Sequence, residues 1–357
     1  MTRADIVIVG GGIAGAGLAA RVSEFADVVL LEGEDSPGYH ATGRSAAMYV
    51  VNYGSDVVRA LNRASGPALD AAGVLTPRGV LIVAEERERH LLDAYLAEPE
   101  VEHVGRARAL EMVPILKAER LADAVLETSA RDIDVDLLFQ GYLKTARANG
   151  ARLVTRARVT GMRRASDWIV ETAAGEFSAP VVVNAAGAWA DSVAAMAGVA
   201  PLGIQPFRRS VARLPAPGGH DVRGWPMLLN APETWYAKPD AGKWLVSPAE
   251  EDPVEAMDAW ADDMVLAEGI ARYQEFVTEE VVRIEGSWAG LRSFAPDRTP
   301  VVGFDPAVEG FFWLAGQGGY GVQTSPAMSA LAAALIGRGM PELDGWVVDG
   351  LSPARFS

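Results

Sequence analysis

The strongest constraint on the fold is a set of elements within the first thirty-two residues. A short apolar run, residues 5–9, leads directly into Gly10, Gly12 and Gly15, in the spacing G-x-G-x-x-G. A small-residue segment follows, and then a second apolar run that ends in Glu32. Strand, glycine turn, helix, strand and acid in this order are typical of a dinucleotide-binding βαβ unit. The alternative is a turn-rich βαβ unit that binds no ligand.

Each residue of this motif has its own physical task. Gly10 permits a tight turn, Gly12 lets the backbone approach a pyrophosphate, and Gly15 lets the helix pack on the strand. The helix that begins near Ile13 directs its amide N–H groups and its positive dipole end toward that pyrophosphate. Glu32 follows the second strand, where a carboxylate accepts hydrogen bonds from ribose hydroxyls.

The composition excludes several classes of function. Lys and Arg number 32 and Asp and Glu number 47, so the net charge is −15, which disfavours nucleic acid and anionic membranes as partners. The absence of cysteine excludes disulfides, thiolate metal sites and a cysteine-linked flavin. No apolar run reaches the ~18 residues of a membrane span, and no signal peptide is recognisable. We therefore expect a cytoplasmic protein.

A second glycine-rich turn near the other end of the chain favours FAD over NAD as the dinucleotide. Residues 316–326 contain this turn, and a helix is expected over 328–336, so that a second helix N-terminus faces the same crevice. The far end of NAD is a free nicotinamide, and a second glycine turn would have little to hold there. A further glycine-rich loop, residues 33–47, is expected to end in a helix start beside the dinucleotide.

The remaining pattern predicts an α/β protein of two interleaved domains. The first is a Rossmann-type FAD-binding domain formed by residues 1–47, 131–204 and 285–357. The second is an α+β substrate-binding domain on a mixed or antiparallel sheet, formed by residues 48–130 and 205–284. A chain of 357 residues is longer than most proteins with a single hydrophobic core, which agrees with two domains.

One segment resembles a metal-binding loop, but we interpret it as the start of a helix. Residues 132–136 resemble the start of a calcium loop, but the glycine at the sixth position and the acid at the twelfth are missing. We expect Asp134 or Asp136 to cap a helix over 137–149 instead, and we expect no metal site. Another helix is predicted over 254–278.

Five segments of the sequence resemble one family of flavoenzymes. They are residues 9–15, 37–47, 184–189, 288–294 and 317–325. In this order they are similar to the D-amino acid oxidase/glycine oxidase/sarcosine oxidase family, and within it most to the bacterial D-arginine dehydrogenase branch. The resemblance implies non-covalent FAD and oxidation of a D-amino acid by hydride transfer from the α carbon to flavin N5. The imino acid formed would hydrolyse to a 2-oxo acid and ammonia, and the electrons would pass to a quinone, oxygen or another acceptor.

Beyond the first glycine motif, these segments and one later strand supply the expected cofactor contacts. They are Ala14, Gly33, Ala41, Thr42, Gly43, Arg44, Ser45, Ala46, Ala47, Met48, Val159, Ala186, Gly187, Trp189, Gly318, Gly319, Tyr320, Gly321, Val322, Gln323 and Thr324.

The resemblance also implies which residues meet the substrate. It assigns Arg209 and Arg292 to the substrate carboxylate, which a planar guanidinium can bind through two parallel hydrogen bonds. The alternative for both is a structural or surface arginine. Tyr53 and Tyr236 match tyrosines that orient or cover the substrate, unless they only pack. Gln323 matches a residue near the amine and the flavin, or else it serves the start of a helix.

Departures from the D-arginine branch predict a different substrate. Where that branch has a histidine and a threonine, this chain has Met48 and Val50. Val80 stands where that branch has a glutamate, which is expected to hold the cationic side chain of the arginine substrate. A guanidinium buried there would lose its partner at a cost of several kcal/mol. We therefore expect apolar or aromatic D-amino acids to be favoured over D-arginine.

Three alternatives remain open. The first is an oxidase or dehydrogenase of glycine, sarcosine or another secondary amine. The second is a flavin-binding subunit without activity, against which the presence of both Arg209 and Arg292 argues. The third is an NAD-linked dehydrogenase, which a yellow purified protein would exclude.

Overall fold

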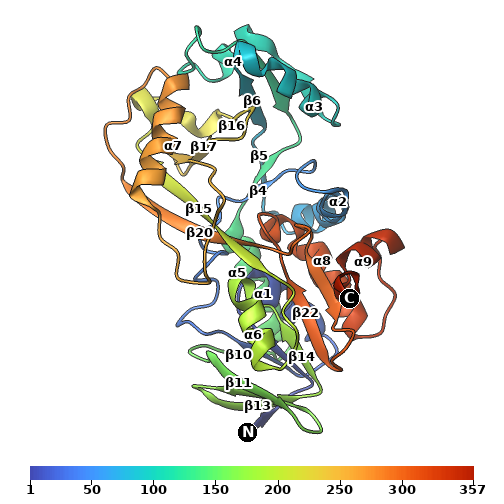
Figure 1. The fold of residues 1–357 in the computed structure, drawn as a ribbon. Coiled ribbons are helices and arrows are strands. Elements are labelled where there is room, and N and C mark those ends of the chain that lie inside the picture. Colours follow the sequence, from blue (N-terminus) through green and yellow to red (C-terminus); the bar gives the residue numbers. More distant parts are fainter.

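A mainly parallel sheet forms the centre of the lower half of the molecule (Figure 1). The structure is a computed structural model that describes residues 1–357. In spatial order the strands of this sheet are β10 (Arg152–Val154), β3 (Val28–Leu31), β2 (Ile6–Val9), β14 (Val181–Asn184), β22 (Phe311–Ala315) and β21 (Val301–Phe304). All pairs are parallel except β22 with β21. Strands β2 and β3 consist of valine, isoleucine and leucine and are buried throughout, as expected for a parallel sheet covered on both faces.

Three helices cover one face of this sheet. They are α1 (Ile13–Val22), α5 (Val135–Ala148) and α8 (Gly321–Ile336). Ile6 and Ile8 of β2 share a core with side chains from all three helices. Gly17 lets α1 and α8 approach closely, because a Cβ at Gly17 would lie 2.4 Å from the Ser329 Oγ atom. This packing fixes the N-terminus of α1 at the carboxyl end of β2.

A smaller sheet and one helix cover the other face. They are β1 (Thr2–Arg3), β13 (Gly175–Ala179), β12 (Trp168–Thr172), β11 (Val159–Arg164) and α6 (Ala190–Met196). Val7 and Val9, the alternate residues of β2, pack into this second layer. Because successive side chains of a strand point to opposite faces, β2 contributes to two separate cores.

The upper half is built on a nine-stranded sheet (Figure 1). Its strands are β19 (Asp252–Pro253), β15 (Gln205–Leu214), β18 (Lys243–Ser247), β17 (Tyr236–Asp240), β16 (Met227–Asn230), β6 (Val80–Ala84), β8 (Asp123–Glu127), β7 (Val101–His103) and β20 (Gly286–Phe294), which pairs with β15. Only β16 and β6 pair in parallel. The helices of this half are α3 (Leu92–Leu96), α4 (Gly105–Met112) and α7 (Asp263–Phe276). Trp235, Trp244 and Tyr273 lie in the core between the sheet and α7.

Short strands, two more helices and several 3₁₀ turns make up the rest of the chain. They are β4 (Met48–Tyr49), β9 (Arg131–Ile133), β5 (Leu75–Pro77), α2 (Asp56–Ala71) and α9 (Gly345–Leu351), and five 3₁₀ turns complete the chain at Glu86–Leu91, Gly187–Trp189, Pro217–Gly219, Val222–Gly224 and Pro353–Phe356. Ser55 caps α2, because its hydroxyl accepts a hydrogen bond from Val58 N. Leu61 and Leu69 of α2 pack into the core that also contains α8.

The predicted α/β fold class is confirmed. Of the two expected caps of α5, Asp134 is the one observed, since it accepts a hydrogen bond from Leu137 N. The helix predicted over 254–278 is wrong in its first part. Asp262 caps α7 by accepting hydrogen bonds from Met264 N and Val265 N, so the helix begins only at Asp263.

Two further predictions about helix starts are corrected. Residues 45–47 do not open a helix, because they are extended and lead into β4. The helix predicted over 328–336 begins earlier, at Gly321, so that Pro326 lies within it. The glycine turn is therefore shorter than expected, and the helix N-terminus lies closer to it.

The predicted domain boundaries stay a prediction, and two elements cross them. Strand β20 was assigned with the cofactor-binding residues, yet it pairs along its length with β15 of the upper sheet. Helix α2 was assigned to the substrate-binding residues, yet it packs against α8. In Figure 1, β15 and β20 lie between the two halves.

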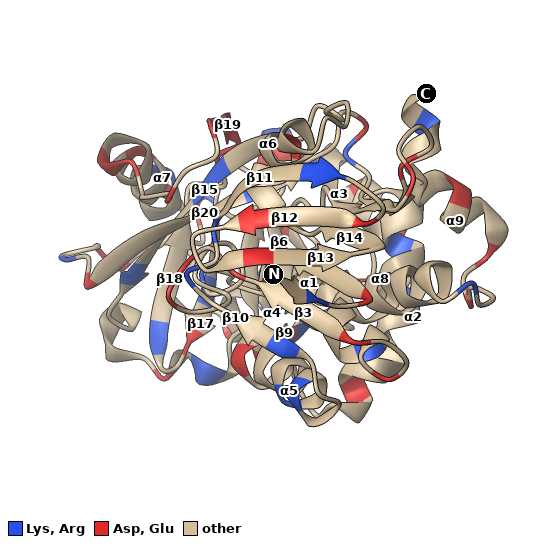
Figure 2. Ribbon diagram, turned by 90° about the horizontal axis from the view of Figure 1, so that it is seen from below, with Lys and Arg blue, Asp and Glu red and all other residues tan.

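Charged residues are distributed over many elements. In the view of Figure 2, acidic and basic residues are interspersed on the strands and helices that face the reader. No helix of this chain combines the length and the apolar character needed to cross a membrane.

Candidate active site

One large cavity extends between the two halves of the molecule. Its volume is about 1200 Å³, and both glycine turns and the upper sheet contribute to its walls. Pockets for single small ligands usually measure about 300–1,000 Å³. This cavity therefore has room for an extended dinucleotide together with a small substrate.

The first glycine turn forms the lower end of the cavity. Gly10 has a positive φ of 109°, and a Cβ there would lie 2.3 Å from the Ala185 carbonyl oxygen, so only glycine fits. Gly15 does not line the cavity, because it packs so close to Gly10 that a Cβ would meet the Gly10 carbonyl oxygen at 2.0 Å. Gly12 and Ile13 at the start of α1 face the cavity. This open helix N-terminus fits a pyrophosphate.

Glu32 lies beside this turn, and hydrogen bonds orient its carboxylate. Its carboxylate is 9% exposed and accepts hydrogen bonds from Gly11 N at 3.1 Å and from Glu34 N at 2.9 Å. Thr42 Oγ1 accepts a hydrogen bond from Ile13 N at 2.9 Å, so the loop over residues 33–47 lies against the start of the helix. A buried acid beside a helix N-terminus supplies the acceptor and the donors that a ribose and a pyrophosphate need.

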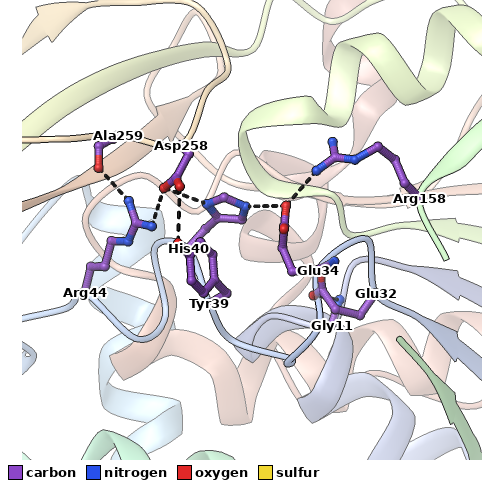
Figure 3. Close-up of polar contacts among 9 residues, drawn as sticks. All are labelled: Gly11, Glu32, Glu34, Tyr39, His40, Arg44, Arg158, Asp258 and Ala259. Carbon is purple, nitrogen blue, oxygen red and sulfur yellow. Dashed lines mark hydrogen bonds and ion pairs between the residues drawn. The ribbon is translucent and has the colours of Figure 1, made fainter. Parts of the chain in front are cut away.

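Arg44 links the loop over residues 33–47 to the upper half of the molecule through hydrogen bonds and an ion pair (Figure 3). Its Nη1 atom donates to the carbonyl oxygens of Ala259, at 2.7 Å, and Ala289, at 3.2 Å, and its Nη2 atom pairs with Asp258. Trp288 Nε1 in turn donates to the Arg44 carbonyl oxygen at 3.0 Å. Arg44 is therefore a largely buried link across the cavity and contacts both β20 and the segment before α7.

A second chain of polar contacts runs beside Arg44 (Figure 3). His40 Nε2 lies 3.0 Å from Glu34 Oε1, which also accepts a hydrogen bond from Arg158 at 2.6 Å. On its other side, His40 Nδ1 lies 3.9 Å from Asp258 Oδ1, and the His40 ring packs on Trp189 with centroids 4.6 Å apart. Sequence reasoning missed Glu34, His40, Arg158 and Asp258, because Arg158 and Asp258 come from distant parts of the chain and join the Glu34–His40 pair only in the fold.

The glycines of the second turn allow neighbouring side chains to pack directly against its backbone. A Cβ at Gly318 would lie 2.2 Å from the Phe294 ring, and a Cβ at Gly319 would lie 3.2 Å from both Arg292 Cζ and Tyr53 Oη. Arg292 Nη1 donates to Tyr53 Oη at 3.4 Å, and the Tyr53 ring packs edge-on against Tyr320 at 5.0 Å. The turn thus brings the N-terminus of α8 next to Arg292.

Arg209 and Arg292 lie on one face of the β15–β20 pair. Arg209 pairs with Gly290, and Arg292 stands two residues further along β20, so the two arginines are diagonal neighbours. Burial, and then the neighbouring positive charge of Arg292, lower the pKa of Arg209. Two cations held this close favour an anion between them.

Glu251 meets this pair of arginines and was not predicted from the sequence. Its Oε1 atom lies 3.2 Å from Arg209 Nη2 and 3.9 Å from Arg292 Nη1. Its Oε2 atom lies 2.9 Å from Arg298 Nη2. Arg209 is fixed further by its Nε atom, which donates to the Glu250 carbonyl oxygen at 2.7 Å. Three guanidinium groups therefore surround one carboxylate, and the site keeps a positive surplus.

Most of the predicted site residues line this one cavity. The residues that do are Gly10, Gly12, Ile13, Ala14, Glu32, Gly33, Ala41, Thr42, Arg44, Ser45, Ala46, Ala47, Met48, Tyr53, Val80, Val159, Ala186, Gly187, Trp189, Arg209, Tyr236, Arg292, Gly318, Gly319, Tyr320, Gly321 and Val322. Gly43 and Thr324 do not. Gly43 is part of the turn of the loop, and Thr324 Oγ1 donates to the Tyr320 carbonyl oxygen within α8.

Gln323 is a further correction. It does not line the cavity, since its side chain is 3% exposed and points toward α2 and the chain before it. Its Oε1 atom accepts a hydrogen bond from Val50 N at 2.9 Å, and its Nε2 atom donates to Asn62 Oδ1 at 2.8 Å. Gln323 is thus turned away from the cavity and is not a helix cap. It links α8 to the segment that leads to Tyr53.

Lys238 points away from the cavity. Its Nζ atom pairs with Asp132 Oδ1 at 2.6 Å and approaches the Ala46 carbonyl oxygen at 3.4 Å. Arg78 Nε also donates to Asp132 at 2.6 Å. This lysine therefore supports the backbone beside the cavity.

The far end of the cavity is apolar over most of its surface. Met48, Val50 and Val80 all line it, in agreement with the expected apolar wall. A carboxyl group that the sequence did not point to also faces this end. Glu127 also lines the cavity, directly opposite Val80 in the β6–β8 pair. Glu127 could not be associated with Val80 without the strand pairing.

The chain belongs to the DAO family of FAD-dependent oxidoreductases. The family model for FAD-dependent oxidoreductases matches residues 5–335, and its cofactor fits the two glycine turns, Glu32 and the cavity volume described above. The protein therefore binds FAD. The narrower likeness to the D-arginine dehydrogenase branch stays a prediction.

Individual relatives support this assignment. Glycine oxidase from Geobacillus kaustophilus is 28% identical over 363 residues, which cover 94% of this chain and 93% of that protein. Human mitochondrial dimethylglycine dehydrogenase is 25% identical, over 99% of this chain but only 44% of its own length. The crystal structure of the Geobacillus glycine oxidase superimposes with a TM-score of 0.82 at 25% identity, covering 96% of this chain and 97% of that one. L-Proline dehydrogenase from P. horikoshii shares the fold with a TM-score of 0.85 at 21% identity, over 99% and 98% of the two chains.

Proposed function

We propose that this protein oxidises D-amino acids to imino acids with its FAD. The observation that carries the proposal is the pair Arg209 and Arg292 on one face of β15 and β20, beside the N-terminus of α8 and within the cavity of the glycine turns. Guanidinium groups in this arrangement suit the carboxylate of an amino acid. A subunit that only holds flavin would not need them.

The residues of the chain bind and orient the substrate. FAD, held at the two glycine turns, would supply the acceptor for the hydride of the α carbon, so that the amine is oxidised to an imine at the cofactor's expense. Arg209 and Arg292 hold the carboxylate and thereby fix the α carbon. Tyr53 and Tyr236, which line the same cavity, cover the substrate. The imino acid then leaves and hydrolyses in water to a 2-oxo acid and ammonia.

The side-chain end favours apolar or aromatic D-amino acids over D-arginine. Met48, Val50 and Val80 surround this space. Two carboxylates at this end already have partners, since Glu98 pairs with Arg59 at 2.9 Å and Glu233 accepts a hydrogen bond from the Tyr95 hydroxyl. A D-arginine side chain would therefore meet mainly an apolar wall.

A second candidate is oxidation of glycine, sarcosine or another secondary amine. It is favoured by the likeness to glycine oxidase over almost the whole of both chains. The arginine pair would hold the carboxylate of these substrates equally well. They have no side chain to fill the apolar end of the cavity, which favours the first candidate.

A steady-state panel with an artificial electron acceptor separates the candidates. It compares D-methionine, D-leucine and D-phenylalanine with D-arginine, D-lysine, L-leucine, glycine and sarcosine. The expected order of kcat/KM places the three apolar D-amino acids first. Higher values for D-arginine and D-lysine would refute the apolar preference, and higher values for glycine or sarcosine would favour the second candidate. Release of hydrogen peroxide in air would identify oxygen as an acceptor.

A further inference from the structure

The pairing of β6 with β8 brings a carboxyl group to the apolar end of the cavity. Val80 and Glu127 stand directly opposite each other in this antiparallel pair. Directly opposite residues project to the same face of a sheet, with Cβ atoms about 4.5–5.5 Å apart. Both side chains line the cavity. The carboxyl group therefore lies beside the residue that makes the wall apolar.

Glu127 is buried and only half satisfied. It is 5% exposed, and its Oε1 atom accepts a hydrogen bond from Asn52 Nδ2 at 3.1 Å. The same Nδ2 atom donates to the Pro99 carbonyl oxygen at 3.0 Å, which uses both of its hydrogens. Asn52 Oδ1 is left without a donor, and the one hydrogen bond that Glu127 accepts from a side chain goes to its Oε1 atom. Buried polar atoms of this kind normally have a partner.

The other carboxylates at this end differ from Glu127. Glu98 pairs with Arg59 at 2.9 Å, and Glu233 Oε1 accepts a hydrogen bond from the Tyr95 hydroxyl at 2.7 Å. Glu127 has neither a cation nor a hydroxyl beside it. It is thus the carboxyl group of this end that a ligand can engage without displacing an existing partner.

We propose that Glu127, oriented by Asn52, is a subsite for an uncharged polar group, a hydroxyl or an amide, at the tip of the substrate's side chain. This inference rests on the proposed function and names the kind of D-amino acid that fits it. The carboxylate would be anchored at Arg209 and Arg292, the shaft of the side chain would lie along Val80, and its tip would reach Glu127.

The carboxyl group suits an uncharged polar tip in either protonation state. Burial, with Glu98 and Glu100 nearby, raises the pKa of Glu127 to about 7. A hydroxyl or an amide can donate to the ionised form and accept from the protonated form, so its hydrogen bond needs neither state in particular.

The test compares substrates that differ by one hydroxyl group, using the FAD-loaded enzyme. The pairs are D-tyrosine with D-phenylalanine and 6-hydroxy-D-norleucine with D-norleucine, which span two side-chain lengths. In the wild type we expect kcat/KM to favour the hydroxylated member of at least one pair about tenfold. In Glu127→Leu we expect this ratio to fall to one or below, because Oε2 is gone, while the value for the unsubstituted member changes less than threefold.

Two further variants complete the test. Glu127→Met gives the same comparison should the leucine variant fold poorly, because methionine adapts to irregular space. Glu102→Gln, an exposed residue of the neighbouring strand β7, is the matched control and should keep the wild-type ratio. Wild-type ratios of one or below for both pairs, or a ratio that survives in Glu127→Leu and Glu127→Met, would overturn the subsite. Failure of all four compounds to reduce the flavin would instead refute the proposed function, and the subsite with it.

Discussion

Arg209 and Arg292 approach the same oxygen atom of Glu251, at 3.2 and 3.9 Å, from two different strands. Strands β15 and β20 come from distant parts of the chain, and their register makes the two arginines diagonal neighbours. An internal carboxylate already lies against both guanidinium groups, so the space around them suits a carboxylate in size and charge. We expect the substrate's carboxylate to use the donors that Glu251 leaves free.

Replacement of Arg292 tests this role. Arg292→Met should lower kcat/KM for D-amino acids about 100-fold, mainly through KM, because a pair of charge-assisted hydrogen bonds contributes ~3 kcal/mol. Arg213→Met, an exposed residue further along β15, is the control and should change kcat/KM less than twofold. Steady-state kinetics with D-phenylalanine measure both. An unchanged KM in Arg292→Met would contradict the assignment.

The link formed by Arg44 should hold FAD in place. Arg44 is 14% exposed and bonds two carbonyl oxygens, whereas its partner Asp258 is 59% exposed. Arg44→Met should raise the Kd of FAD at least tenfold, since the loop over the dinucleotide is released from β20. Asp258→Asn should change it less than threefold, because exposed ion pairs contribute about 0–1 kcal/mol. Titration of the apoprotein with FAD gives both constants, and equal effects would argue against this division of roles.

Gln323 should matter for stability. Gln323→Leu leaves the Val50 N–H and the Asn62 side chain without their partners in a buried place, which should lower the free energy of unfolding by about 2 kcal/mol. Gln140→Leu on the exposed side of α5 should change it by less than about 0.5 kcal/mol. Urea unfolding measures the difference. Unchanged stability together with a lower kcat would restore the role predicted from the sequence.

Glu127 should make stability depend on pH. Its pKa rises from 4.5 in the unfolded chain to about 7 in the fold, so between these values the folded protein keeps a proton that the unfolded chain releases. Stability is therefore lost as pH rises through this window, by about 3 kcal/mol in total. Glu127→Gln should gain stability over the wild type at pH 8 and lose most of this advantage at pH 4.5. Glu24→Gln, an exposed control, should show no such trend, and a pH-independent difference for Glu127→Gln would refute the shift.

The sequence predicted secondary structure well where the pattern depends on residues that are close together in the chain. The apolar runs and glycine spacing of residues 5–32 predicted β2, α1 and β3. These patterns depend on neighbours within one or two turns. Helix α7 was predicted too long because an apolar pattern before Asp262 suggested a helix that the cap at Asp262 prevents.

The site was predictable only in part, because much of it depends on pairing between distant residues. Arg44 and Asp258 are 214 positions apart, and no local pattern connects them. Glu127 became relevant only when the register of β8 placed it opposite Val80. Gln323 directly follows residues 317–322, which line the cavity, and one helical position is enough to turn its side chain toward Asn62.

The most direct test of the whole account is anaerobic reduction of the enzyme-bound flavin. The purified yellow protein is mixed without oxygen with D-phenylalanine, and with L-phenylalanine as the control, while the absorbance of the oxidised flavin is followed. We predict that the D enantiomer bleaches the flavin band, that the L enantiomer does not, and that Arg292→Met slows the bleaching at low substrate concentration. A flavin band that persists with every D-amino acid, or bleaching equally fast in Arg292→Met, would contradict the account.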